Sequence, residues 1–145
     1  LLKPMASTLV SVDYSPAMLT IHHSVHGEPC SVGSAFQLPF ADDAFDLVFS
    51  ARLSHHISDN EERAKYVREI LRVAGPWAII TIFDTGSIKN RMRDMRRKFS
   101  NKRPKNTFSR AEMDAIVQSS GYRTVKGIPL SRLASGHVFY VLKKQ

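Results

Sequence analysis

Short apolar runs alternate with amphipathic stretches along most of the chain, and this alternation predicts its secondary structure. Runs rich in small, β-branched or aromatic residues predict strands at residues 8–12, 30–32, 45–49, 77–83, 122–128 and 137–142. Apolar residues at helical spacing predict helices at residues 16–25, 58–74, 87–98 and 109–121. Strands and helices alternating in this way are typical of a doubly wound, mostly parallel α/β sheet, and the two consecutive strands at the end predict an added antiparallel hairpin.

The first apolar run, TLVSV, ends at Asp13 and is followed by a helix start. Ser15 can accept hydrogen bonds from the first-turn amides, and Pro16 at the first helical position lacks only an N–H that would be unpaired anyway. Asp13 is therefore expected at the carboxyl end of a strand, where doubly wound sheets bind ligands and an acid can accept bonds from both hydroxyls of a ribose. Taken alone, Asp13 is better explained as a solvated turn residue.

Two later helices carry the spacing of a capping box, in which a Ser is followed by a Glu three residues on. These boxes begin at Ser58 and Ser109. In the first helix the apolar spacing predicts a buried stripe made of Ala64, Val67, Ile70 or Leu71, and Ala74. The charged residues of that helix, Arg63 among them, are expected mostly outside the stripe, and Gly75-Pro76 is expected to end the helix. The second helix is expected to bury Met113, Ile116 and Val117.

Several motifs in a fixed order then point to a family. Residues 12–19 read VDYSPAML, residues 32–50 read VGSAFQLPFADDAFDLVFS, and residues 53–57 read LSHHI. This series resembles the class I S-adenosylmethionine-dependent methyltransferases, in the small-molecule branch with the pattern VDxSPxML, GDAxxLPFxDxxFDLV and LHHI. The resemblance extends over nearly the whole chain. It implies a Rossmann-like fold, S-adenosylmethionine as the cofactor and a small molecule as the methyl acceptor.

The resemblance also implies roles for individual residues. Asp13 would bind the cofactor ribose, while the loop that follows the strand at residues 30–32 would face the adenine. The implied cofactor contacts are Asp13, Tyr14, Met18, Ser34, Ala35, Phe36 and Ser50. Ala51, Arg52 and His55 would line the pocket in which the methyl group is transferred. For Phe36, ordinary core packing is an equal alternative to contact with adenine.

His55 and His56 invite a catalytic or metal-binding interpretation. Adjacent residues on a helix or strand point apart, so the pair is not expected to chelate one ion, and no third ligand is evident. For these two histidines we favour a structural role first. A base that deprotonates a hydroxyl or amine acceptor is the second interpretation, and metal binding is the last. Methyl transfer from a sulfonium needs little acid-base help, because most of the rate can come from orientation. His55 is therefore the one candidate catalytic residue, and no metal site is predicted.

The sequence departs from the family pattern in two places. The residues before Asp13 contain no glycine, whereas the family carries a first strand and a glycine-rich turn there. Three explanations are open: the sequence is truncated, the second strand of the family pairs directly with the fourth, or another chain fills the gap, as in a dimer. Truncation is the one we favour, so a missing first strand and helix is part of the expected fold. Ser34 stands where the family usually has an Asp, which leaves open a degenerate member that serves as a binding or scaffolding module.

Composition and charge narrow these expectations. The length of 145 residues predicts a single domain, residues 1–145, and the one cysteine, Cys30, favours a reducing, cytoplasmic setting without disulfides. No apolar run approaches a transmembrane length. The segment between Lys89 and Lys105 holds nine basic residues and one acidic residue, which accounts for the whole net charge of +8. We expect residues 87–106 to form a basic helical lid over the substrate pocket. The second interpretation of this segment is that it attracts an anionic substrate or membrane surface, and the third is that it binds RNA.

Overall fold

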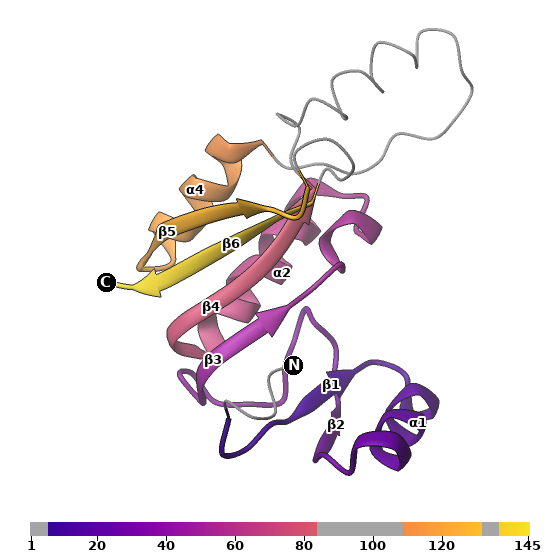
Figure 1. Cartoon of the computed structure of the whole chain (residues 1–145). Helices are drawn as coiled ribbons and strands as arrows, with labels where there is room; N and C mark the ends of the chain where they lie inside the picture. Colours follow the sequence, from indigo (N-terminus) through magenta and orange to yellow (C-terminus); the bar gives the residue numbers. More distant parts are fainter. Residues whose placement is uncertain (1–5, 84–108, 132–136) are drawn as a thin grey trace, which may run out of the picture. The chain divides into compact units, whose positions relative to one another are not determined.

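The computed structural model describes residues 6–83, 109–131 and 137–145 of the chain. These residues belong to two compact units, one within Leu1–Pro39 and the other within Phe40–Gln145, and Figure 1 colours them along the sequence. The expected helix at residues 87–98 and the basic segment from Lys89 to Lys105 lie outside the described residues. No helix in the described ranges has both the length and the apolar character needed to cross a membrane.

The first unit is a βαβ arrangement made of β1 (Ser11–Asp13), α1 (Pro16–His26) and β2 (Cys30–Val32). The strands are parallel, with Asp13 opposite Val32. The start of α1 is as predicted, because Ser15 Oγ accepts a hydrogen bond from the Met18 N–H at 3.4 Å. The helix ends at Gly27, whose φ of 67° is the left-handed conformation that glycine adopts without strain. Strand β1 is shorter than the predicted run at residues 8–12 and includes Asp13 as its last residue.

The second unit contains one four-stranded sheet and its helices. In chain order its elements are β3 (Phe45–Ser50), the short 3₁₀ helix η2 (Ser54–His56), α2 (Asn60–Val73), β4 (Ala74–Phe83), α4 (Arg110–Ser119), β5 (Tyr122–Pro129) and β6 (His137–Lys144). The strand order is β3-β4-β6-β5. Strands β3 and β4 are parallel, whereas β6 runs antiparallel to both β4 and β5. The predicted α/β class and the predicted antiparallel ending are both confirmed.

Helices α2 and α4 pack side by side against one face of the sheet (Figure 1). The core between them contains Val67, Leu71, Ile80, Met113 and Leu142, each with at most 2% of its surface exposed. The capping box of α4 is present as predicted. Ser109 Oγ accepts a hydrogen bond from the Glu112 N–H at 3.2 Å, and the Glu112 carboxylate accepts one from the Ser109 N–H at 2.8 Å.

Three predictions about α2 are wrong. Its N-cap is Asp59 rather than Ser58, because the Asp59 carboxylate accepts the Glu62 N–H at 2.9 Å. Arg63 is 4% exposed rather than outside the stripe, since α2 packs against α4 as well as against the sheet. The helix ends at Val73, so Ala74, which was predicted in its buried stripe, and Gly75-Pro76, which were predicted to precede the next strand, all lie inside β4. A Cβ on Gly75 would lie 3.1 Å from the Phe45 carbonyl oxygen, so glycine here lets β4 approach β3 closely.

A buried tyrosine connects α2, β4 and β5. Tyr122 is the first residue of β5 and is 1% exposed. Its hydroxyl lies 3.1 Å from the Leu71 carbonyl oxygen and 2.7 Å from that of Gly75, and it also reaches the carbonyl of Ala74. Burial raises the pKa of Tyr122 to about 12, and the nearby Asp43 carboxylate adds to the effect. The neutral hydroxyl is therefore held in place as a hydrogen-bond donor.

Candidate functional site

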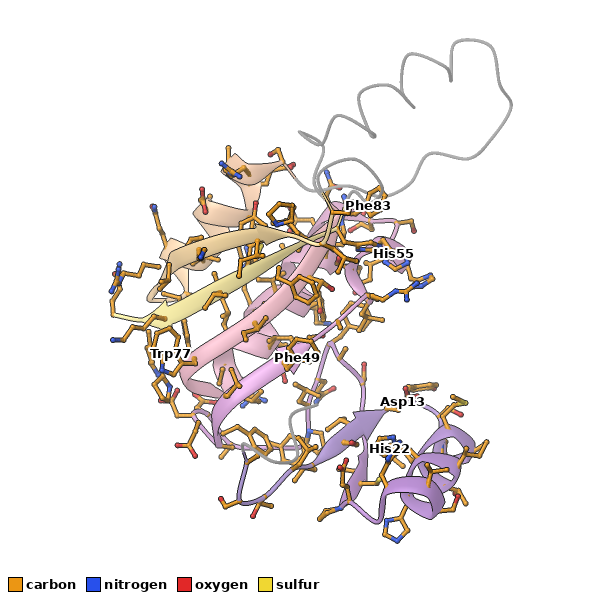
Figure 2. All side chains as sticks on the ribbon, viewed as in Figure 1. Asp13, His22, Phe49, His55, Trp77 and Phe83 are labelled. Atoms are coloured by element: carbon orange, nitrogen blue, oxygen red, sulfur yellow. The ribbon has the colours of Figure 1, made fainter. Side chains whose placement is uncertain are left out.

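The first group of predicted site residues lies at the carboxyl edge of the parallel pair β1 and β2. Asp13 ends β1 and faces Val32 at the end of β2, and the Gly33 N–H donates to the Asp13 carbonyl at 3.1 Å. The loop that follows Gly33 therefore begins beside Asp13. The Asp13 side chain is exposed (Figure 2), and one of its carboxylate oxygens accepts the Ser15 N–H at 2.8 Å. No described residue donates a hydrogen bond to the other oxygen, which can therefore accept one from a ligand hydroxyl.

The loop after β2 is a tight turn that begins at a glycine. A Cβ on Gly33 would lie 2.8 Å from Pro39 Cδ and 3.2 Å from Val12 Cγ1, so a larger residue would displace the loop. Ser34 Oγ accepts the Phe36 N–H at 3.2 Å, and the Ser34 carbonyl accepts the Gln37 N–H at 2.9 Å. Within the described ranges the Ala35 N–H has no hydrogen-bond partner. The Phe36 ring is half-buried.

These groups fit the functional groups of a nucleoside. A carboxylate oxygen accepts hydrogen bonds from ribose hydroxyls, and the Ser34 hydroxyl and the Ala35 amide can donate to ring nitrogens of adenine. Two apolar side chains of the same unit are also exposed, Tyr14 at 80% and Met18 at 57%. The donor and acceptor set of this edge is therefore compatible with the adenosine part of S-adenosylmethionine. Contact between these residues and the cofactor remains a prediction.

In the second unit, the predicted residues follow the carboxyl end of β3. Ser50 is the last residue of that strand, and its hydroxyl hydrogen-bonds the Tyr66 hydroxyl of α2 at 2.6 Å. Tyr66 is completely buried, and burial raises its pKa to about 12. The Ser50 side chain is thereby turned toward α2. Sequence reasoning missed Tyr66, although it shares one helix face with Arg63 and Ile70.

The segment between β3 and η2 is attached to β4 through one buried residue. Thr81, which is 1% exposed, accepts the Arg52 N–H on its hydroxyl oxygen at 2.5 Å. Its carbonyl accepts the Ser54 hydroxyl at 3.0 Å. Arg52 has a φ of 62°, a conformation that costs a residue with a side chain about 1–2 kcal/mol. Thr81 was not predicted as a site residue, because in the sequence it is one more β-branched residue of an apolar strand.

His55 lies within a cluster of rings at the end of β4 and the start of β6. Figure 2 shows His55 beside Phe83, and their ring centroids are 6.3 Å apart. The His55 ring is also 5.1 Å from that of His137 and 4.0 Å from that of His56. The expectation that the His55 and His56 side chains point apart is therefore wrong, because a single 3₁₀ turn does not fix side-chain directions as a long helix does. Among the described residues no group of three or more His, Cys, Asp or Glu could hold a metal ion.

One hollow of the second unit lies away from these residues. It has a volume of about 450 Å³ and is formed by α4, β5 and the end of the chain. Its lining residues are Asp114, Val117, Gln118, Arg123, Thr124 and Gln145. It is wide open and contains none of the predicted site residues. The carboxyl ends of β1, β2 and β3 therefore remain the candidate functional sites.

Comparison with known proteins decides the family. The model of a methyltransferase domain family matches residues 1–82, which is more than half of the 145 residues. The chain belongs to this methyltransferase family. Its cofactor is accordingly S-adenosylmethionine, and the expectation drawn from the sequence motifs is confirmed at this level.

Individual relatives resemble only part of the chain. Norajmaline N-methyltransferase of Rauvolfia serpentina is 45% identical over 51 residues, which is 35% of this chain and 16% of that protein. Chloroplastic tocopherol O-methyltransferase of Arabidopsis thaliana is 40% identical over 57 residues, 39% of this chain and 16% of that protein. The matched stretch thus spans about a sixth of either relative.

Solved structures show the same fold at low sequence identity. Magnesium protoporphyrin IX methyltransferase of Synechocystis, solved with bound S-adenosylhomocysteine, has a TM-score of 0.78 at 10% identity and matches 98% of this chain and 66% of its own. An S-adenosylmethionine-dependent methyltransferase of Clostridium acetobutylicum has a TM-score of 0.74 at 12% identity, covering 99% and 77% of the two chains. These similarities establish a Rossmann-like methyltransferase fold.

Proposed function

We propose that the protein transfers a methyl group from S-adenosylmethionine to a small-molecule acceptor. Membership of the methyltransferase family supports the reaction type. The names of the two plant relatives, norajmaline N-methyltransferase and tocopherol O-methyltransferase, support a small molecule as the acceptor. The acceptor atom is open, since these two relatives differ in it.

One observation carries the assignment of the cofactor site. The parallel pairing of β1 and β2 brings Asp13 and the loop after Gly33 to the same sheet edge. In a doubly wound sheet this edge is where nucleotides bind. Asp13 is assigned to the ribose, and Ser34, Ala35 and Phe36 are assigned to the adenine. Tyr14 and Met18, in the same unit, complete the contacts proposed at this edge.

The proposed chemistry depends on orientation. S-adenosylmethionine supplies an activated methyl group on a sulfonium, whose leaving group departs uncharged. The protein then has to bind both reactants and align them, a contribution that can provide most of the rate enhancement. Ala51, Arg52 and His55, in the segment after β3, are the proposed acceptor contacts. His55 is the candidate base for an acceptor that must lose a proton.

The test is calorimetric binding of S-adenosylhomocysteine to the chain and to two variants. Asp13→Asn should bind about tenfold more weakly, because an amide loses the charge-assisted bonds to the ribose. The amide oxygen can still accept the Ser15 N–H, so the turn before α1 should be preserved. Asp46→Asn is the matched control, since Asp46 is an exposed aspartate on β3 outside the proposed site. Equal binding by all three proteins would exclude Asp13 as the ribose ligand.

A second candidate function is a binding module that uses the fold without catalysis. The observation in its favour is Ser34, whose hydroxyl already stabilises the turn and carries no charge for an adenine amino group. Absence of any heat with S-adenosylhomocysteine, from protein shown to be folded by circular dichroism, would favour this candidate. Transfer of a methyl group from S-adenosylmethionine that is lost in Asp13→Asn would exclude it.

A further inference from the structure

Arg52 has an uncommon backbone conformation just after the carboxyl end of β3. It comes two residues after the carboxyl end of β3 and has a φ of 62°. Positive φ is uncommon for a residue with a side chain, and among the described non-glycine residues only Asp43 shares it. Strained residues at ligand-binding edges are often held there by their surroundings for a functional reason. The structure shows what holds this one.

Thr81 fixes Arg52 from the neighbouring strand. Its hydroxyl oxygen accepts the Arg52 N–H at 2.5 Å, and its carbonyl accepts the Ser54 hydroxyl at 3.0 Å. Thr81 is buried and lies in β4, which is paired on both sides, with β3 and with β6. Both ends of the segment from Arg52 to Ser54 are thus attached to a rigid strand. The direction in which the Arg52 side chain leaves the backbone is set by this attachment.

The side chain of Arg52 contrasts with those of two other arginines in the same unit. Arg63 is buried and hydrogen-bonds Asn60, and Arg72 pairs with carboxylates on both sides. The Arg52 guanidinium is exposed and forms no hydrogen bond or ion pair with any described residue. A guanidinium offers a planar fork of N–H donors that matches a carboxylate or a phosphate. A fixed backbone and a guanidinium without a partner among the described residues together suit the binding of an anion.

We propose that Arg52 binds an anionic group of the methyl acceptor and that Thr81 is the residue that positions it. The inference rests on the proposed methyltransferase function and narrows its substrate class. The acceptor is an acid that carries a carboxylate or a phosphate. The carboxylate in the amino-acid part of the cofactor is a second anion that Arg52 could bind. The experiment therefore distinguishes binding of the acceptor from binding of the cofactor.

The experiment is an NMR titration of the ¹⁵N-labelled chain that follows the Arg52 Nε–Hε signal, assigned by its loss in Arg52→Gln. The probes are sodium benzoate and inorganic phosphate, with uncharged benzamide as the matched control. Benzoate or phosphate should shift the signal to saturation, and benzamide should not. In Arg52→Gln the shifts of neighbouring amides should require about tenfold more anion, while Arg68→Gln, on the exposed side of α2, should behave as the unaltered chain.

Two Thr81 variants test its positioning role. Thr81→Val removes the hydroxyl that accepts the Arg52 N–H and should weaken benzoate binding severalfold. Thr81→Ser keeps the hydroxyl and should bind benzoate as tightly as the unaltered chain. Loss of packing alone would not produce this outcome. If Thr81→Val does not fold, the comparison is made between Thr81→Ser and Thr81→Ala. Equal anion binding in variants with and without the hydroxyl would overturn the role of Thr81.

Cofactor analogues then distinguish the acceptor from the cofactor. S-adenosylhomocysteine carries a carboxylate, whereas 5′-methylthioadenosine lacks the amino-acid part. If S-adenosylhomocysteine competes with benzoate for Arg52 and 5′-methylthioadenosine does not, Arg52 binds the cofactor and the proposal is overturned. Simultaneous binding of S-adenosylhomocysteine and benzoate supports it. Binding of S-adenosylhomocysteine without any anion effect at Arg52 would refute this inference alone, while benzoate binding without S-adenosylhomocysteine binding would refute the proposed function.

Discussion

Replacing Tyr122 by Phe removes a single hydroxyl from the junction of α2, β4 and β5. That hydroxyl donates among the carbonyl oxygens of Leu71, Ala74 and Gly75, at 3.1 Å from the first and 2.7 Å from the last. One proton serves one acceptor at a time, so the loss is about one hydrogen bond, worth roughly 0.5–1.5 kcal/mol. The side chain is 1% exposed, so the acceptors left behind stay without water, which adds roughly 1 kcal/mol. We expect Tyr122→Phe to lower the free energy of unfolding by about 2 kcal/mol.

The measurement is urea unfolding at neutral pH, followed by far-ultraviolet circular dichroism. Tyr14→Phe is the matched control, because Tyr14 is 80% exposed and loses only a solvated hydroxyl. The control should change the free energy of unfolding by less than about 0.5 kcal/mol. A Tyr122→Phe variant as stable as the control would refute the view that this hydroxyl connects the three elements.

The same variant predicts a dependence on pH. The folded state raises the pKa of Tyr122 from 10.0 to about 12, mainly through burial. A folded pKa above the unfolded one means that this stabilisation is complete below pH 10.0 and is lost as the pH rises toward 12. The stability difference between the unaltered chain and Tyr122→Phe should therefore shrink across this alkaline window. A constant difference would show that the hydroxyl titrates equally in both states.

Three further predictions concern single contacts. Tyr66→Phe removes a buried bond of 2.6 Å to Ser50 and should lower the unfolding free energy by about 1–2 kcal/mol in the same urea assay; no change would mean that the bond is absent in solution. Gly33→Ala places a Cβ 2.8 Å from Pro39 Cδ, so it should displace the loop and weaken S-adenosylhomocysteine binding in calorimetry, whereas undiminished binding would show that the loop does not contact adenine. Ser109→Ala breaks the capping box of α4 and should lower the free energy of unfolding in urea by about 1 kcal/mol, while Ser109→Asp should retain most of the stability.

Elements governed by local rules could be predicted from the sequence. The capping box of α4 and the cap of α1 depend on residues a few positions apart, and both are present. The start of α2 was misplaced by one residue, because Ser58 and Asp59 are both good caps and the local signal does not choose between them. Burial of Arg63 and the inclusion of Gly75 in β4 depend on α4 and β3, which are distant in sequence.

In the candidate site, too, some features could be predicted from the sequence and others depend on residues that are distant in sequence. The meeting of Asp13 with the loop after Gly33 follows from the parallel direction of two successive strands, and a sequence pattern can reveal that direction. The link between Arg52 and Thr81 joins residues almost thirty positions apart through one hydroxyl. Nothing in an apolar run distinguishes that threonine from its neighbours. The conformation of Arg52 was unpredictable for the same reason, since its cause lies on another strand.

Helix α2 ends at Val73 and strand β4 begins at Ala74, with no linking residue between them. One added residue in the helix would rotate its face by about 100°, and one added residue in the strand would turn every side chain of β4 to the opposite side of the sheet. Neither error has a loop in which it could be absorbed. We expect this junction to tolerate substitutions far better than insertions or deletions, so that the length of the chain between Asp59 and Thr81 is itself under constraint.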